Sequence, residues 1–369
     1  MQRTAAAALA IFASVATAQV GPPPGPVADS GKSIDEAEPR TPINARHTPG
    51  DATAAFLITR SGSYYLTGNL VALSSQIGDV GIRVDAPDVT IDLSGFTING
   101  RGVFASAVVA AGDNVALRNG IIKDTAGDAV NISGAASVAQ DLRITMAGDE
   151  ALELGSDARV ARCTVAQAVG TGIRAGERAD ISHCDVRRAD DGISAGTASR
   201  ISDSVAAFCE DDGLRAGGSS LIIRCQAFDN TDLGIVATGP SQVIECVASS
   251  NDGFGGISVG AGSHVERCIA RSNAGIGISL TNACVVIGCS SGENTGFGYS
   301  IGSDNRIEGN HAARNDGGGD RIVGSFNVIV RNAAVVNSVT NYDNAGANNY
   351  FTTTSSATSG PADANVSLP

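Results

Sequence analysis

The stretches RADDGISAG and CEDDGLRAG each place a pair of aspartates directly before a glycine. The pairs are Asp190 with Asp191 and Asp211 with Asp212. Paired carboxylates can act as general acid and base, and carboxylate oxygens are the ligands that Ca²⁺ prefers. Aspartate is also a common turn residue, because its side chain accepts hydrogen bonds from nearby backbone amides. The pairs therefore fit either a functional site or the turns of a repeating fold.

The aspartate pairs belong to a repeat that runs through the chain from residue 81 onward. Each unit begins with a small residue, which is followed by an apolar, a variable and an apolar residue and then by a polar turn. The units begin at Gly81, Ala107, Ala129, Ala151, Gly172, Gly192, Gly213, Gly234, Gly256, Gly277 and Gly298. After a first interval of 26 residues, the spacing is 20–22 residues. Such regularity indicates a solenoid.

Short segments rich in Val and Ile, such as SQVIECVA, recur between Gly, Asn, Asp and Ser, and no helical pattern of ten residues occurs. A leucine-rich repeat would need a leucine framework, and a left-handed hexapeptide helix would have a shorter period. A coil with three short strands per turn fits best. The sequence therefore predicts an all-β solenoid of about a dozen turns that resembles the right-handed parallel β-helix of the pectate-lyase-like superfamily.

Six of the eight cysteines share one register of the repeat: Cys163, Cys184, Cys225, Cys246, Cys268 and Cys289. Ser204 fills the gap in this column, and Asn310 and Asn332 continue it. Turns of such a coil lie about 4.8 Å apart, but stacked side chains are poorly oriented for a disulfide. We expect buried free thiols rather than a metal site, because no CxxC spacing occurs. Cys209 and Cys284 lie outside the column and are the candidates for greater reactivity.

Acidic residues gather at one corner of the predicted coil, just before the small residue that opens each unit. They are Asp128, Asp149, Glu150, Asp190, Asp191, Glu210, Asp211, Asp212 and Asp232. The outward position of the strand that follows holds Glu153, Arg174 and Arg215. The acids become rare after Asp232, although the repeat continues. This localisation is more than the repeat alone demands.

The composition limits the function and the location of the chain. The formal net charge is −13, with 38 acidic and 25 basic side chains, which argues against nucleic-acid binding. Residues 1–18 have the charge, apolar stretch and Ala-Thr-Ala site of a signal peptide, and no later segment reaches membrane-spanning length. We expect a monomer that is secreted, periplasmic or held at the cell surface.

The remaining sequence divides at changes in composition. We expect a linker and irregular lead-in at 19–50, the coil at 51–340 with an N-terminal cap and first strands at 51–80, and a C-terminal cap with a disordered tail at 341–369. The stretches SIDEAEPRTPINARHTPGDATAAFLITRSGSYYLTGNL and GIRVDAPDVTIDLSGFTING resemble a family of exported bacterial right-handed β-helix repeat proteins. This resemblance covers nearly the whole mature chain and implies fold and export rather than activity.

The resemblance to pectate-lyase-like enzymes implies candidate roles. In such lyases Ca²⁺ on stacked acids holds a uronate, and a basic residue removes the adjacent proton. Here Asp190, Asp191, Asp211 and Asp212 would hold Ca²⁺, and Arg215 or Arg174 would be the base. Glu150 and Glu153 would contact the polysaccharide, and Phe208 and Phe228 would stack on its rings. Related hydrolases resemble the chain less, because their second motif aspartate is replaced by Glu150.

A non-catalytic role is the alternative. Turns of 20–22 residues leave little room for the long loops that wall the grooves of the enzymes on this fold, and the chain contains no Trp. The chain would then be a carbohydrate-binding, surface or adhesion protein, with a structural acidic corner.

Overall fold

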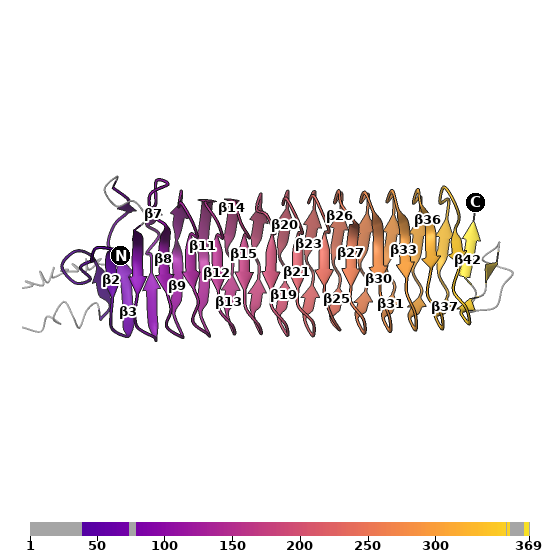
Figure 1. Cartoon of the computed structure of the whole chain (residues 1–369), viewed down its shortest axis with the longest axis horizontal. Helices are drawn as coiled ribbons and strands as arrows, with labels where there is room; N and C mark the ends of the chain where they lie inside the picture. Colours follow the sequence, from indigo (N-terminus) through magenta and orange to yellow (C-terminus); the bar gives the residue numbers. More distant parts are fainter. Residues whose placement is uncertain (1–38, 74–78, 352, 355–364, 369) are drawn as a thin grey trace, which may run out of the picture. The chain divides into compact units, whose positions relative to one another are not determined.

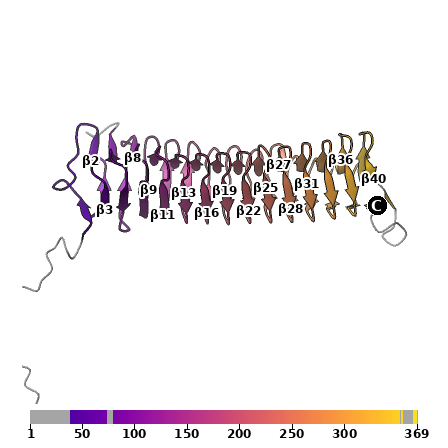
Figure 2. The same ribbon diagram turned by 90° about the horizontal axis from the view of Figure 1, so that it is seen from below.

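The computed structural model describes residues 39–73, 79–351, 353–354 and 365–368. The expected signal peptide at 1–18 and most of the linker lie outside these residues. The unit that starts at Arg40 consists of short strands stacked turn upon turn along one axis (Figures 1 and 2). The described part of the chain contains no helix long and apolar enough to cross a membrane.

The strands form three parallel rows, so the chain is a right-handed parallel β-helix of about 14 turns. The first row is a sheet of its own, which we call the small sheet. Its strands are β2 (Ala54–Ile58), β5 (Val80–Val84), β8 (Ser106–Ala110), β10 (Val130–Ile132), β12 (Leu152–Leu154), β15 (Ile173–Ala175), β18 (Ile193–Ala195), β21 (Leu214–Ala216), β24 (Ile235–Ala237), β27 (Gly255–Val259), β30 (Ile276–Leu280), β33 (Phe297–Ile301), β36 (Gly318–Ile322) and β39 (Tyr342–Asn344).

The other two rows share the large sheet. The row that follows the small sheet in each turn, the second row, holds β1 (Thr41–Ile43), β3 (Gly62–Leu66), β6 (Val89–Asp92), β9 (Ala116–Lys123), β11 (Val138–Ala147), β13 (Arg159–Ala161), β16 (Asp180–Ser182), β19 (Arg200–Ser202), β22 (Leu221–Ile223), β25 (Gln242–Ile244), β28 (His264–Glu266), β31 (Val285–Ile287), β34 (Arg306–Glu308), β37 (Val328–Val330) and β40 (Tyr350–Phe351).

The third row leads back to the small sheet. It holds β4 (Leu70–Val71), β7 (Thr97–Asn99), β14 (Thr164–Ala168), β17 (Asp185–Arg187), β20 (Val205–Ala207), β23 (Gln226–Phe228), β26 (Val247–Ser249), β29 (Ile269–Arg271), β32 (Ser290–Gly292), β35 (His311–Ala313), β38 (Ala333–Val335) and β42 (Asn365–Leu368), with β41 (Thr353–Thr354) paired to β42. The long strands β9 and β11 span the corner and pair in both rows.

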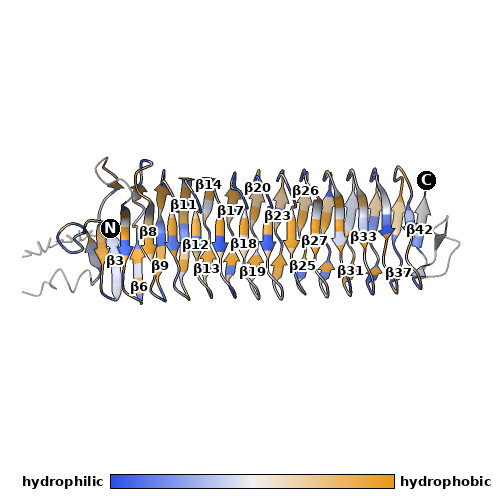
Figure 3. Ribbon diagram, in the orientation of Figure 1, coloured by the Kyte–Doolittle hydropathy of each residue, from blue (hydrophilic) through white to orange (hydrophobic). Residues whose placement is uncertain are grey.

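The core is a set of stacked aliphatic columns inside the coil. In β15 and β18, for example, Ile173 pairs with Ile193, and both are fully buried, whereas Arg174 and Ser194 between the buried positions face outward. The period of two residues along a strand produces this alternation. Hydrophobic and hydrophilic residues accordingly alternate along the strands (Figure 3).

The predicted cysteine column is confirmed, and the eight cysteines are free and buried. The column lies at the corner between the second and third rows. The backbone N–H of Cys184 donates to Ser204 Oγ (3.1 Å), and that of Cys289 donates to Asn310 Oδ1 (2.7 Å). Contact with Cys184 and burial raise the pKa of Cys163. The thiols therefore fill the place of a side-chain ladder as small neutral groups.

Two further ladders occupy the remaining corners. One runs through Asn230, Asn251, Asn273, Asn294, Asn315 and Asn337, and Cys209 stands at its head, donating its N–H to Asn230 Oδ1 (3.0 Å). The other ladder consists of serines at first and of asparagines farther along the coil. Cys284 belongs to it, and the backbone N–H of Cys284 donates to Asn305 Oδ1 (2.7 Å). Both thiols are 1 % exposed, so neither is more accessible than the cysteine column.

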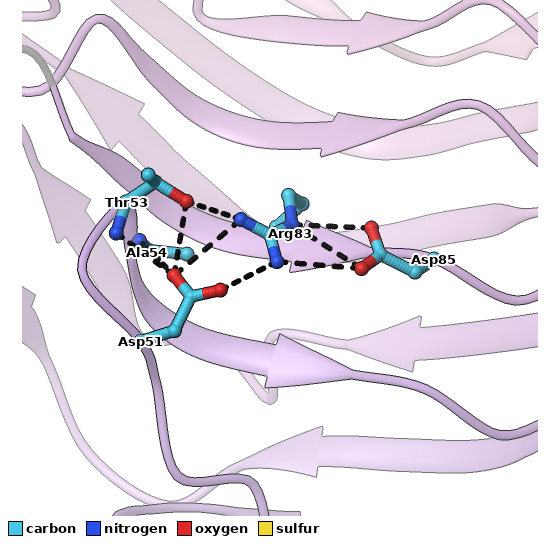
Figure 4. A network of polar contacts seen from close by, with 5 residues as sticks. All are labelled: Asp51, Thr53, Ala54, Arg83 and Asp85. Atoms are coloured by element: carbon cyan, nitrogen blue, oxygen red, sulfur yellow. Dashed lines mark hydrogen bonds and ion pairs between the residues drawn. The ribbon is translucent and has the colours of Figure 1, made fainter.

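The coil extends beyond both expected boundaries. β1 lies within the expected irregular lead-in and pairs in register with β3. Arg83 of β5 joins Asp51 to Asp85 and thereby fastens the segment before β2 to the next turn (Figure 4). At the other end, β39 pairs with β36 and β42 pairs with β38, so stacked strands continue past residue 340. Asn365 of β42 also extends the side-chain column of Asn310 and Asn332, because its Oδ1 accepts the backbone N–H of Asn332.

Candidate functional site

The acids gather at the corner where the third row turns into the small sheet, and we call the nine residues from Asp128 to Asp232 named above the acidic corner. The glycine that follows each pair is needed for packing. A Cβ atom on Gly213 would lie 2.7 Å from the carbonyl oxygen of Gly234 in the next turn. The Gly of Asp-Asp-Gly is therefore structural, whatever the aspartates do.

One acid per turn has a structural role. Asp191 Oδ1 accepts the N–H of Asp212 (3.3 Å), Asp212 Oδ1 accepts that of Leu233 (3.1 Å), and Asp128 Oδ1 accepts that of Glu150 (3.3 Å). Each bond joins a side chain to the backbone of the next turn. Turn chemistry thus explains one aspartate of a pair and leaves Asp149 and Asp211 without such an explanation.

The first group of acids consists of Asp128, Asp149 and Glu150, whose carboxylate oxygens lie within 4.8 Å of one another. Burial and the neighbouring Asp149 raise the pKa of Glu150 to about 6, and Arg174 opposes the shift. Arg174 Nη2 lies 2.8 Å from Glu150 Oε1 and donates to Thr171 Oγ1 (2.9 Å). This group thus pairs three carboxylates with one arginine from the next turn.

A second group of three carboxylates lies three turns, or about 14 Å, farther along the coil, and its arginine comes from the same turn as its last aspartate. It consists of Asp191, Asp211 and Asp212, again within 4.8 Å of one another. The Asp212 side chain is 1 % exposed and is paired with Arg215. Burial raises the pKa of Asp212 to about 6, and burial with the nearby Asp191, Asp232 and Asp190 raises the pKa of Asp211.

The other corners treat charge differently. There, exposed positions with positive φ alternate acid and base, as in Asp141 with Arg162, Asp203 with Arg224 and Glu245 with Arg267. Like charges about 5 Å apart repel by about 3 kcal/mol at an effective dielectric constant near 20. The acidic corner stacks nine such acids. Among the ion pairs of the described residues, two arginines, Arg174 and Arg215, pair with acids of this corner.

The structure brings together only part of the expected site. Asp191, Asp211 and Asp212 meet, but Asp190 is exposed and lies outside their group. Glu153 faces outward on β12 in register with Arg174, and Asn131 joins it to Asp128. Arg174 and Arg215 lie on β15 and β21, separated by Ser194 of β18. Asp128 and Asp149 complete the first group, and their position before Ala129 and Ala151 was the signal for them.

The two expected aromatic residues lie beside each other on successive turns of the coil. The ring centroids of Phe208 and Phe228 are 5.8 Å apart in an edge-to-face arrangement, and Phe208 is 43 % exposed. The guanidinium of Arg188 lies 5.8 Å from the Phe208 ring centroid. Phe208 precedes Asp211 by three residues, so the aromatic pair borders the acidic corner.

The donor sets of the two groups suit a hard divalent cation. Each offers three carboxylates, which is the ligand type of Ca²⁺ and Mg²⁺, and no sulfur or imidazole is present in either group. The arginine of each group competes for one carboxylate. A cation would therefore bind with Asp191, Asp211 and Asp212 at the expense of the contact between Asp212 and Arg215.

Comparisons with known proteins agree with the fold. Residues 212–359 match the protein-family model described as "Right handed beta helix region". The periplasmic alginate epimerase AlgG is similar over 85 % of this chain and 78 % of that chain, with 11 % identity and a TM-score of 0.51. A mutant of the same epimerase is similar over 88 % of this chain and 81 % of that chain, with 11 % identity and a TM-score of 0.52.

The mannuronan C-5 epimerase AlgE4 A-module of Azotobacter vinelandii is similar over 84 % of this chain and 87 % of that chain, with 15 % identity and a TM-score of 0.47. None of the curated proteins matches the sequence. The chain has the fold of a right-handed parallel β-helix, and identities this low establish only the fold.

Proposed function

We propose that the protein is an exported β-helix that acts on a polysaccharide of uronic acids at the acidic corner, with Ca²⁺ held by Asp191, Asp211 and Asp212. The observation that carries the proposal is the repeated group of three carboxylates and one arginine, in a protein that pairs opposite charges at its other corners. Similarity to the periplasmic alginate epimerase named above supports a uronic-acid polymer as the substrate in this proposal. Export rests on the signal peptide expected at residues 1–18.

The residues of the corner have distinct roles in this proposal. Bound Ca²⁺ would attract the sugar carboxylate and acidify the proton beside it. Asp212, once it binds a cation, no longer holds Arg215 as tightly, and Arg215 is then free to face a sugar lying over β21. Arg215, or Arg174 at the first group, would remove the proton at C5 of the uronate in a β-elimination. The glycosidic C4–O4 bond would break, a C4=C5 double bond would form, and the leaving oxygen would take a proton from water. Glu150 and Glu153 would bind sugar hydroxyls.

A non-catalytic carbohydrate-binding or adhesion role is the second candidate. Arg174 and Arg215 are each ion-paired to a carboxylate, and a guanidinium does not readily give up a proton in a protein, which opposes a role as base. In this case the acidic corner would bind the polysaccharide through Ca²⁺ without cleaving it. The two candidates differ in one product, an unsaturated uronate, which absorbs ultraviolet light.

The first test is a thermal melt of the chelator-treated mature protein across a Ca²⁺ titration. A ligand of the folded state stabilises it by about 2.7 kcal/mol at a hundred times its Kd, so we expect a rise in Tm. The rise should vanish in the Asp211→Asn/Asp212→Asn double variant and should fade below pH 6, because the pKa of Asp212 is about 6 and the protonated carboxyl does not bind metal.

The exposed Asp252→Asn variant is the control, and it should keep the full response to Ca²⁺. Alginate and polygalacturonate are then tested for unsaturated products. A wild-type Tm that does not respond to Ca²⁺ would reject the cation site. Polymer binding without product would favour the second candidate.

A further inference from the structure

A hollow of about 580 Å³ runs along the edge of the third row beside the acidic corner. It is lined by Asp124, Thr125, Met146, Ala147, Gly148, Gln167, Ala168, Val169, Arg188 and Glu210. These residues come from successive turns, so the hollow extends along the axis of the coil, across the strands. Its lining leads directly into the acidic corner, since Ala147 and Gly148 are followed by Asp149 and Glu150.

Gly148 contributes only backbone to the lining of the hollow. A Cβ atom on Gly148 would lie 2.2 Å from the carbonyl oxygen of Ala126, so the backbone of the neighbouring turn excludes any larger residue there. Met146 and Val169 beside it are 47 % and 74 % exposed. Leaving two large apolar side chains in water beside a depression is typical of a surface that binds a partly apolar ligand.

Arg188 lines the hollow and differs from six of the seven other arginines at positive-φ positions of the coil. The seventh, Arg101, has no ion pair within the described ranges either. Arg162, Arg178, Arg224, Arg267, Arg314 and Arg331 each pair with a carboxylate. Within the described ranges, Arg188 has no such partner and lies over the ring of Phe208 instead. Its guanidinium is thus held in place by an aromatic face, while its N–H groups remain available.

We infer that the hollow binds one segment of an acidic polysaccharide along the coil axis, with Arg188 as the residue that recognises a sugar carboxylate. This inference rests on the proposed function and adds the place and the direction of the polymer. A guanidinium binds a carboxylate through two parallel hydrogen bonds. Met146, Val169 and Phe208 offer apolar surface to the faces of the sugar rings. A polymer in this position passes both groups of acids.

The test measures binding of alginate and polygalacturonate, in the presence of Ca²⁺, by affinity gel electrophoresis. Arg188→Gln should weaken binding about tenfold or more, because a charge-assisted bidentate pair is lost. Arg188→Lys should recover part of the loss. Val169→Asp should also weaken binding, by placing a negative charge in the floor. The matched control is Arg178→Gln, an exposed arginine at positive φ that is paired with Asp157 and lies at another corner.

The outcomes separate the inference from the proposed function. If the wild-type protein binds neither polyuronate, the proposed function fails. If the wild type binds and Arg188→Gln and Val169→Asp bind equally well, the inference is wrong and the proposed function stands. Loss of binding in the Arg178→Gln control to the same extent would also overturn the inference, because it would show a general effect of net charge. Fully methyl-esterified polygalacturonate should bind wild type and Arg188→Gln alike.

Discussion

Asp320 is a carboxyl group inside the core of the coil. It belongs to the inward column of the small sheet, between Tyr299 of β33 and Tyr342 of β39, and is 2 % exposed. The hydroxyls of both tyrosines donate to backbone carbonyls, of Cys289 (2.9 Å) and Asn332 (3.0 Å) respectively. Arg321 faces outward over Phe297, and the ion pairs of the described segments include none with Asp320. Burial raises the pKa of Asp320 to about 7.

The raised pKa makes the stability of the C-terminal turns depend on pH. The unfolded carboxyl loses its proton near pH 3.8, and the folded one near pH 7, so the folded state binds the extra proton between these values. The free energy of unfolding therefore falls as the pH rises from about 4 to about 7, by up to about 4 kcal/mol, and then levels off.

Asp320→Asn should remove this contribution. We expect the variant to have a higher Tm than wild type at pH 8. At pH 4 we expect no difference in Tm, because the wild-type carboxyl is largely neutral in both the folded and the unfolded state. The measurement is the difference in Tm between variant and wild type across this range, which cancels the contributions of Glu150 and Asp212. Parallel profiles for the two proteins would show that Asp320 is not buried as described.

The asparagine ladder shows what one short strand contributes to the next. Asn273 Oδ1 accepts the backbone N–H (3.1 Å) and the side-chain N–H (2.8 Å) of Asn251, and Asn273 Nδ2 donates to Ala248 (3.2 Å) and Asn294 (2.9 Å). These groups are fully buried. A three-residue strand makes few ladder bonds of its own, so the side-chain ladder at the corner sets the register between turns.

Asn273→Ala should destabilise the coil by about 3 kcal/mol, because two buried donors of Asn251 lose their acceptor. The midpoint of urea unfolding measures the loss. Asp252→Ala is the control on the neighbouring exposed position, and it should change stability by less than about 0.5 kcal/mol. Equal midpoints for Asn273→Ala and the control would mean that water satisfies the ladder.

The coil as a whole must protect its two ends, because a terminal turn presents unpaired strand edges. At the C-terminal end β42 covers β38, and Asn365 Oδ1 accepts the N–H of Asn332 (2.9 Å). At the other end the segment before β2 is held by the contacts of Arg83 with Asp51. β42 thereby pairs with the edge of β38, and Arg83 holds the segment before β2 against the next turn.

Truncation after residue 364 should uncover the edge of β38 and cause association at concentrations at which the full chain stays dispersed. Size-exclusion chromatography measures this, together with a lower Tm. Asn365→Ala provides the comparison, since it removes the ladder bonds and keeps the strand. It should lower Tm without association. A truncated chain that elutes like the full chain would contradict a protective role for β42.

Much of this architecture follows from sequence periodicity. The 20–22 residue spacing predicted the all-β coil, its turn length and the cysteine column, because each turn must return to the same register to bury its apolar column. The same argument could have found the ladder from Asn230 to Asn337, whose spacing is equally regular. It could not place the ends of the coil, because β1 and β42 lie outside the repeat and are held by pairing with distant strands.

The candidate site depended more on three-dimensional structure. Periodicity predicted that the acids share a corner, since residues in equivalent positions of successive turns must stack. It did not show that the Asp190 carboxylate stays outside the group of Asp191, Asp211 and Asp212, although the backbone of Asp190 pairs with that of Asp211. Nor did it show the partners of Arg174 and Arg215, or that Arg188 has an aromatic ring where six other corner arginines have a carboxylate. Those features depend on side-chain directions at the turns, which the backbone of the next turn decides.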